Sequence, residues 1–406
     1  MTHVAAIGTY LPCWGTPARR VVSSDEDAVT LAVAAGRAAI SAAGDGTADW
    51  VRRVVLVSRD LPLLEGGNAA VLLAGLDLDP ETEVTEQLGG APAALDAVMA
   101  APPWTLVITA DERPAGAAAA LTADEGLDVR QTGRVSRSLP VRTRDAAGSV
   151  HDYGDPRLLR ERGVLASLAR LAEAGTGPDK PLAVAGVDAK LAASICAGQP
   201  PALPTSGASS ALFALAALAE TRSAGALLAA EQATVAGAQV GSGPVTVHRA
   251  EPTARPLPAS TMPDAKEIPV SLAAYERAFE PKVRFEAARY AGDDELEFPP
   301  RYRVGQDGSL RTDYTLVPLP RAGTVYTGVT VRLPVPGLPA PYSLVIVELD
   351  DVGLRALARV TGAEAGTVSI GDRGRMVLRR VAVRSGVPDY GYAFYPEEAE
   401  LARSGA

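Results

Sequence analysis

The sequence predicts a layered α/β domain at the N-terminus, followed by a small all-β domain. Over residues 1 to about 245, short apolar runs alternate with alanine-rich segments of helical character. Beyond about residue 269, β-rich runs separated by Pro and Gly turns replace that alternation. The length of 406 residues also exceeds that of a typical single domain, so two domains are expected.

Four continuous apolar runs predict strands that are buried on both faces. They are VRRVVLVS (51–58), WTLVITA (104–110), PLAVAGV (181–187) and GALLAAEQ (225–232). The segment at 25–44 predicts a helix, with Ser23 and Glu26 forming a capping box and Gly44 ending the helix. Alanine dominates the composition of this half, and its small side chain suits closely packed layers.

The N-terminal half contains an internal echo. GAPAAL begins at Gly90 and is followed by VITADE, which ends at Glu112; GASSAL begins at Gly207 and is followed by LLAAEQ, which ends at Gln232. Each unit pairs a small-residue helix start with a buried strand ending in an acid or amide. The echo predicts two similar βα halves.

Residues 249–268 are rich in Pro, Ala, Ser and Thr, and predict a linker between domains at 1–248 and 269–400. About five short strands in the second domain predict a small barrel or sandwich. The strand segments are TVYTGVTVRL (324–333), YSLVIVEL (342–349), LRALARV (354–360) and MVLRRVAVRS (376–385).

Charge and composition exclude several kinds of partner. The net charge of −9 provides no basic face for a phosphate backbone, so no nucleic-acid partner is expected. The first residues lack the features of a signal peptide, and no apolar run is long enough to cross a membrane. With only two cysteines as well, the sequence predicts a cytoplasmic protein without a membrane partner.

Four segments of the N-terminal domain resemble the thiolase-like superfamily, specifically 3-hydroxy-3-methylglutaryl-CoA synthase and ketoacyl-acyl-carrier-protein synthase III. The segments are IGTYLP (7–12), DEDAVTLAVAAGRAAI (25–40), LGGAPAALDAVM (88–99) and TSGASSALFALAAL (205–218). The resemblance implies a duplicated five-layer fold and an obligate oligomer, formed with a second copy or with a thiolase-like or ketosynthase-like partner.

That family uses a cysteine thiolate that CoA thioesters acylate, an assisting histidine and often an asparagine. Placed by motif, the cysteine position falls on Leu88 or Gln87, and the histidine position lies near Ala185 or Gly186. The asparagine position falls on Thr205 or on Pro204 beside it. The family's glycine-rich loop is replaced by AEQATVAGAQ (230–239). All three chemical positions have thus lost the residue type that the reaction needs.

The C-terminal domain resembles an acyl-CoA-associated zinc-ribbon and OB-fold family. The matching segments are FPPR (298–301), GTVYTGVTV (323–331), PAPYSLVIVELDD (339–351) and YAFYP (392–396). The family's thiolate pairs would fall near Tyr290 and Asp293, then near Val304 and Asp307, and none of these is Cys or His. No zinc is therefore expected, and the remaining OB-like barrel is expected to contact a thiolase partner.

Isolated reactive residues have simpler interpretations. Cys13 and Cys196 are expected to be small core residues. His151, among acidic neighbours, is expected to be a solvated loop or interface histidine rather than a base or a metal ligand. His3 and His248 have no supporting cluster of residues.

Three basic residues close to the FPPR segment have two open interpretations. Arg301, Arg303 and Arg311 are candidates for binding CoA phosphates or an acidic partner surface, and a plain solvated face explains them equally well.

The leading hypothesis is a pseudoenzyme, a non-catalytic subunit of an acyl-CoA condensing or acyltransferase complex that has no cofactor of its own. A coenzyme A thioester or an acyl carrier protein is its possible ligand. One alternative is an enzyme that acts alone on acyl-CoA or malonyl thioesters, either as a decarboxylase using Gln87 or as an acyltransferase. The other alternative is a module that only binds acyl-CoA or an acyl carrier protein.

Overall fold

The chain is described from a computed structural model, which folds into two compact units. The structure describes residues 1–64, 66–139, 141–145, 147–178, 180–262, 271–292, 295–304, 307–333, 338–384 and 386–397. The first unit comprises residues 1–21 and 31–254, and the second comprises 22–30 and 255–406. The change from one unit to the next at Ala254 falls within the segment 249–268, of which residues 263–268 lie outside the described ranges.

The first half of unit 1 forms five strands of a mixed sheet. Its elements are β1 (Thr2–Tyr10), α1 (Ala28–Ala43), η1 (Thr47–Trp50), β4 (Arg53–Ser58), α2 (Ala69–Leu76), β5 (Glu83–Leu88), α3 (Ala91–Ala100), β6 (Thr105–Glu112) and β7 (Ala115–Ala123). The strand order is β5-β4-β6-β7-β1, in which β5, β4 and β6 are parallel and β7 is antiparallel to β6 and β1. A small hairpin of β2 (Gly15–Thr16) and β3 (Arg19–Arg20) follows β1.

The second half repeats this pattern with one strand fewer. Its elements are β8 (Leu127–Ser136), β9 (Arg142–Arg144), β10 (Val150–Asp152), η2 (Leu158–Leu165), α4 (Ala166–Glu173), β11 (Ala183–Ala185), α5 (Ala189–Ile195), α6 (Ser209–Glu220), β12 (Gly225–Glu231), β13 (Thr234–Val240) and β14 (Thr246–Ala250). The order β11-β12-β13-β8 corresponds to β4-β6-β7-β1. Residues 196–208, all described, contain no strand, so this half has no counterpart of β5.

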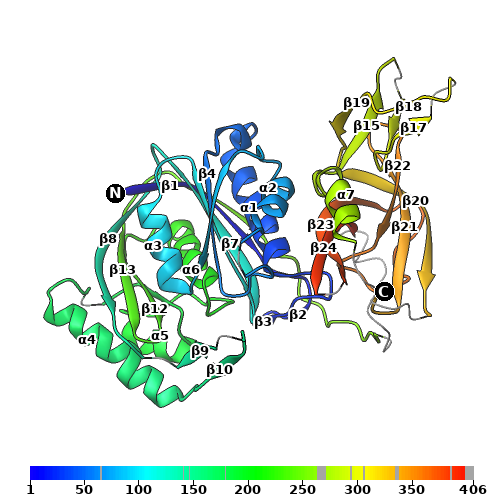
Figure 1. The fold of residues 1–406 in the computed structure, drawn as a ribbon. Helices are drawn as coiled ribbons and strands as arrows, with labels where there is room; N and C mark the ends of the chain where they lie inside the picture. Colours follow the sequence, from blue (N-terminus) through cyan, green and yellow to red (C-terminus); the bar gives the residue numbers. More distant parts are fainter. Residues whose placement is uncertain are drawn as a thin grey trace. The chain divides into compact units, whose positions relative to one another are not determined.

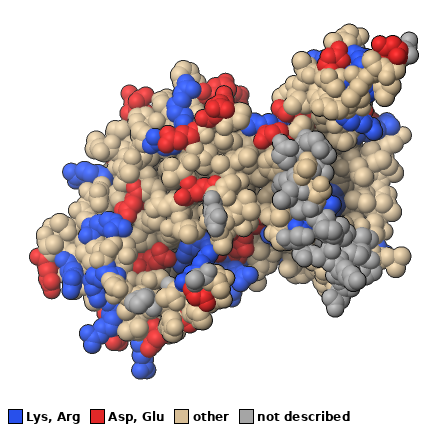
Figure 2. Space-filling view, viewed as in Figure 1, with Lys and Arg blue, Asp and Glu red and all other residues tan. Residues whose placement is uncertain are grey.

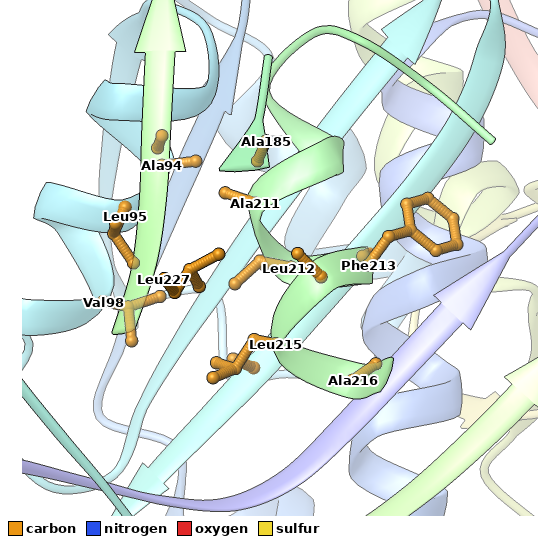
Figure 3. Close-up of a cluster of buried hydrophobic side chains, with 14 of the residues drawn as sticks. Ala94, Leu95, Val98, Ala185, Ala211, Leu212, Phe213, Leu215, Ala216 and Leu227 are labelled. Atoms are coloured by element: carbon orange, nitrogen blue, oxygen red, sulfur yellow. The ribbon is translucent and has the colours of Figure 1, made fainter. Parts of the chain in front are cut away.

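The two half-sheets join where β1 pairs with β8, and together with the helices between them and on their outer faces they make five layers (Figure 1). Helices α3 and α6 lie between the half-sheets and form the central core, in which Leu95 and Val98 of α3 meet Leu212 and Leu215 of α6 (Figure 3). On the far face of β11–β13, η2, α4 and α5 bury Val164, Leu171 and Leu191. The duplicated α/β architecture expected from the internal echo is confirmed.

The four apolar runs all form strands, but an alanine-rich run that the sequence did not assign to a strand does so as well. Residues 115–123, AGAAAALTA, form the fully buried strand β7. Alanine favours helix by intrinsic propensity, yet here small side chains are needed because α6 contacts this strand. Tertiary packing therefore overrides local preference.

Helix α1 begins later than the capping box predicted. The Glu26 carboxylate does accept a hydrogen bond from Ser23 N (3.0 Å), but the helix starts at Ala28, and Asp27 accepts the hydrogen bond from Thr30 N (3.0 Å). Gly44, with φ of +105°, ends the helix as predicted. The predicted linker also begins late, because Arg249 and Ala250 complete β14, which pairs in parallel with β1.

Unit 2 contains the predicted all-β domain. Its five-stranded sheet has the order β22-β21-β20-β23-β24. The strands are β20 (Ala322–Val331), β21 (Tyr342–Leu349), β22 (Arg355–Arg359), β23 (Arg373–Arg384) and β24 (Val387–Pro396). The other elements are α7 (Leu272–Arg284), β15 (Glu286–Tyr290), β16 (Leu296–Glu297), β17 (Arg303–Val304), β18 (Leu310–Arg311) and β19 (Tyr314–Pro318). The sequence did not indicate that residues 22–30 belong to this unit, where Tyr390 Oη donates to the Asp27 carboxylate (2.8 Å).

On the surface seen in Figure 2, acidic and basic side chains are interspersed over the first unit. Among the described residues, no helix combines the length and apolar character that a membrane crossing requires.

Close contact between α1 and β1 depends on Gly8. A Cβ atom at this position would lie 2.1 Å from Ala39 N, a backbone atom of α1. We expect Gly8→Ala to lower the free energy of unfolding of the first unit by about 2–3 kcal/mol, because the helix must shift. Urea denaturation followed by circular dichroism measures this change. Gly198→Ala is the control, since no atom lies within 4 Å of a Cβ there, and an equal loss in both variants would contradict the packing argument.

Candidate functional site

The candidate site of unit 1 lies where β4, β6 and β12 end and α3 and α6 begin. Strand β6 ends in Asp111 and Glu112, and β12 ends in Glu231. Helix α3 starts after Gly90, and α6 starts after Ala208. The first backbone N–H groups of a helix have no partner within the helix and carry partial positive charge, so these two starts attract anions.

Asp111 occupies the start of α6. Its carboxylate accepts hydrogen bonds from Ala208 N (2.9 Å), Ser209 N (2.8 Å) and Ser209 Oγ (2.5 Å). A Cβ on Gly207 would lie 1.9 Å from a carboxylate oxygen, so only glycine leaves room for this contact. Burial raises the pKa of Asp111 above its ordinary value of 3.8, although the hydrogen bonds from Ser209 and Ala208 and the charge of Arg59 act in the opposite direction.

Glu231 occupies the start of α3 in the same way. Its carboxylate accepts a hydrogen bond from Gly90 N (2.9 Å) and forms an ion pair with Arg59 Nη1 (2.8 Å). A Cβ on Gly90 would lie 2.6 Å from that carboxylate. The two contacts are reciprocal, because the first half supplies the acid for α6 and the second half supplies the acid for α3. The sequence echo ended its strands one residue further on, at Glu112 and Gln232, and did not identify these acids as caps.

The two candidates for the cysteine position, Gln87 and Leu88, end the edge strand β5. The Leu88 side chain is 58% exposed, and Gln87 is half-buried. Helix α3 begins three residues after Leu88, and the Gly90 N–H at its start is bound to Glu231. Unpaired N–H groups at a helix start normally lower a thiol pKa, and here one of these groups, that of Gly90, is bound to a carboxylate.

The histidine position has no room for a side chain at Gly186. This residue has φ of +83°, and a Cβ there would lie 2.0 Å from Ala230 O and 2.9 Å from the Ala91 Cβ. The other candidate, Ala185, is fully buried in β11. An imidazole at Gly186 would require the backbone of β12 to move.

The asparagine position, Thr205 or Pro204, adjoins the Asp111 contacts. Thr205 is buried, and its Oγ1 lies 2.7 Å from Ser209 Oγ. Thr205, Ser209 and Asp111 thus form a buried chain of hydrogen bonds. Segment 230–239 is not a loop: it forms the end of β12, the turn at Gln232 and most of β13.

In unit 2, the candidate phosphate-binding residues Arg301 and Arg303 already have a carboxylate partner. Both side chains form ion pairs with Glu297. Desolvation raises the pKa of Glu297, but the hydrogen bonds from these two arginines outweigh it and hold this pKa below its ordinary value. Arg301 remains widely exposed, whereas Arg303 also stacks 4.8 Å from the centroid of the Tyr290 ring.

One of the four positions predicted for zinc ligands, Tyr290, belongs to an aromatic cluster instead. Tyr290 is buried beneath the guanidinium groups of Arg303 and Arg311 and packs edge-on against Tyr314, with centroids 5.5 Å apart. Val304 and Asp307 lie at the surface, and Asp293 lies outside the described residues. Within the described ranges, no three His, Cys, Asp or Glu side chains group in a way that would hold a metal ion.

The remaining candidates lie away from the starts of α3 and α6. Cys13 is buried, and partial burial raises the pKa of Cys196. His151 lies 3.7 Å from Asp145, His3 lies 2.8 Å from Asp128, and His248 is exposed on β14.

Asp111→Asn tests the cap of α6. The amide offers one acceptor instead of two, so one donor among Ala208 N and Ser209 N faces another donor. We expect the free energy of unfolding to fall by about 3 kcal/mol, measured by urea denaturation. Asp124→Asn, in an exposed turn, should change it by less than about 0.5 kcal/mol. Equal effects would show that Asp111 is not a cap.

The pH dependence of the same variant tests the raised pKa. A carboxyl whose pKa is higher in the folded state stabilises the fold below its unfolded pKa, near 3.8, and loses that contribution as pH rises through the folded pKa. The stability difference between the wild type and Asp111→Asn should therefore shrink as the pH rises above about 4. A difference that grows with pH would contradict the direction of the shift.

Known proteins resemble parts of this chain. The model of the C-terminal OB-fold domain of ChsH2 matches residues 316–379. Two solved structures are similar to about three-fifths of this chain. One is 3-oxoacyl-[acyl-carrier-protein] synthase III from Aquifex aeolicus, with 15% identity and a TM-score of 0.45 over 59% of this chain and 100% of that chain. The other is the HMG synthase of the curacin biosynthetic pathway, with 13% identity and a TM-score of 0.46 over 60% of this chain and 80% of that chain. No curated protein matches the sequence significantly. The chain thus combines an N-terminal unit of duplicated α/β architecture with a C-terminal domain of which residues 316–379 match the ChsH2-type OB-fold.

Proposed function

We propose that this chain is a non-catalytic subunit of an acyl-CoA condensing or acyltransferase complex. It would support an active thiolase-like or ketosynthase-like partner and its acyl-CoA channel. The single observation that carries the proposal is the Glu231 carboxylate at the start of α3, bound to Gly90 N and Arg59. An acid at this place repels a second anion, whether a thiolate or the oxyanion of a thioester intermediate.

Two further features support a non-catalytic role. A side chain at Gly186 would overlap Ala230 O, so the position closest to the family histidine is closed sterically. Thr205 is held in the buried chain of hydrogen bonds with Ser209 and Asp111, where its hydroxyl is engaged with protein rather than directed to a ligand. Restoring the reaction would therefore need more than replacing one residue.

A partner protein is proposed from the edge of the sheet. Strand β5 ends the strand order, so one side of its backbone has no neighbouring strand among the described residues. Exposed edge strands are favourable places for pairing with another chain. Leu88, at the end of this edge, adds an exposed apolar side chain. We propose that the oligomer forms along β5, in the cytoplasm, with an acyl-CoA or an acyl carrier protein as the shared ligand and no cofactor bound by this chain.

Coexpression tests the complex. We expect the full chain to copurify with any thiolase-like protein that a neighbouring gene encodes, as a complex whose stoichiometry is read from its native mass. Leu88→Arg should weaken this complex at least tenfold, because a charge would be buried at the edge of β5. Leu64→Arg is the matched control, since both leucines are 58% exposed. A monomeric chain that neither binds nor alters the partner would overturn the proposal.

The purified chain alone distinguishes the other functions. Incubated with malonyl-CoA or acetyl-CoA, it should show no added acyl mass and no turnover. Decarboxylation that Gln87→Ala abolishes would identify an enzyme instead. Tight binding of CoA esters in calorimetry, without any protein complex, would identify a binding module.

A further inference from the structure

Arg20 is a buried cation without a carboxylate partner. Its side chain, on β3, is only 6% exposed. Nη1 donates to Pro12 O (2.7 Å), while Nε is buried without a partner. In the part of the chain that the structure describes, no Asp or Glu forms an ion pair with this guanidinium.

Such an arrangement is costly. Burial of an unpaired charge strongly destabilises a fold, so buried arginines are normally paired. Arg379 in unit 2 illustrates the usual solution: equally buried, it forms an ion pair with Glu26 and donates to Thr361 Oγ1. Within the described ranges, Arg20 has neither a carboxylate nor a hydroxyl partner, and its one hydrogen-bond acceptor is the carbonyl oxygen of Pro12.

The local backbone directs Arg20 inward. Gly15 has φ of +110° and lets the chain turn into a hairpin in which Gly15 pairs with Arg20 and Thr16 pairs with Arg19. Successive side chains of a strand point to opposite sides, so Arg19 is exposed and Arg20 faces the buried segment 11–14. The hairpin has only two paired positions, and such a short element opens easily.

We propose that Arg20 binds an oxyanion of the phosphate class, either free phosphate or the phosphoryl group of a larger ligand. Nε and Nη2 lie on one edge of the guanidinium and form the fork that binds two oxygens of a phosphate. A small displacement of the hairpin uncovers Nε, and the anion then supplies both the missing acceptor and the missing charge. This inference does not depend on the proposed function, because it concerns a ligand of this chain and not its partner.

Thermal unfolding of the full chain in phosphate and in chloride, at equal ionic strength, tests the proposal. Phosphate should raise the Tm of the wild type by about 3 °C when it is well above its Kd. Arg19→Met, the neighbouring exposed arginine, should keep this shift. Arg20→Met should lose it, and in chloride should be at least as stable as the wild type, because an unpaired buried charge has been removed.

Three results would overturn the proposal. They are the absence of a phosphate shift in the wild type, a shift of full size in Arg20→Met, and a loss of stability or folding of Arg20→Met in chloride, which would show that Arg20 is already compensated within the protein. Coenzyme A distinguishes the two sources of phosphate. A larger Arg20-dependent shift with coenzyme A than with inorganic phosphate indicates a phosphorylated ligand, and equal shifts indicate free phosphate.

Discussion

The reciprocal capping of α3 and α6 is the interaction on which the first unit depends. Each half supplies the carboxylate that satisfies the helix start of the other half: Asp111 binds Ala208 N and Ser209 N, and Glu231 binds Gly90 N. These helices form the middle layer, so their starts are enclosed by protein and need internal acceptors. The same contacts explain why Gly90 and Gly207 carry no side chain.

Much of the fold could be predicted from the sequence, because its strongest signals are local. Continuous apolar runs predicted β4, β6, β11 and β12, and the four strand segments of the second domain predicted β20 to β23. Strand β7 could not be recognised, since an alanine run has no β propensity of its own and becomes a strand only because α6 packs on it. The assignment of residues 22–30 to unit 2 also depends on tertiary contacts, such as the one from Tyr390 to Asp27.

Less of the site could be predicted. Gln87 and Leu88 lie at the end of β5, Gly186 lies just after β11, and Thr205 lies just before α6, so the motif register did select positions at strand ends and helix starts. The capping acids Asp111 and Glu231 lie within the two segments of the internal echo, but the sequence does not identify them as caps. Each carboxylate binds a helix start in the opposite half, and such a long-range contact cannot be recognised from local sequence. Arg20 had no signal at all: an arginine in a Pro- and Gly-containing loop is usually exposed, and only the pairing of Gly15 with Arg20 turns it inward.

The cations of the molecule show what is unusual about its charge arrangement. Arg59 is compensated by Glu231, Arg379 by Glu26, and Arg301 and Arg303 by Glu297. Arg20 departs from this pattern, because it is buried and no acid that the structure describes compensates its charge. Among the described residues the only other buried arginine, Arg379, is neutralised by an acid of this chain, so a ligand that carries the missing charge is the simplest physical explanation of Arg20.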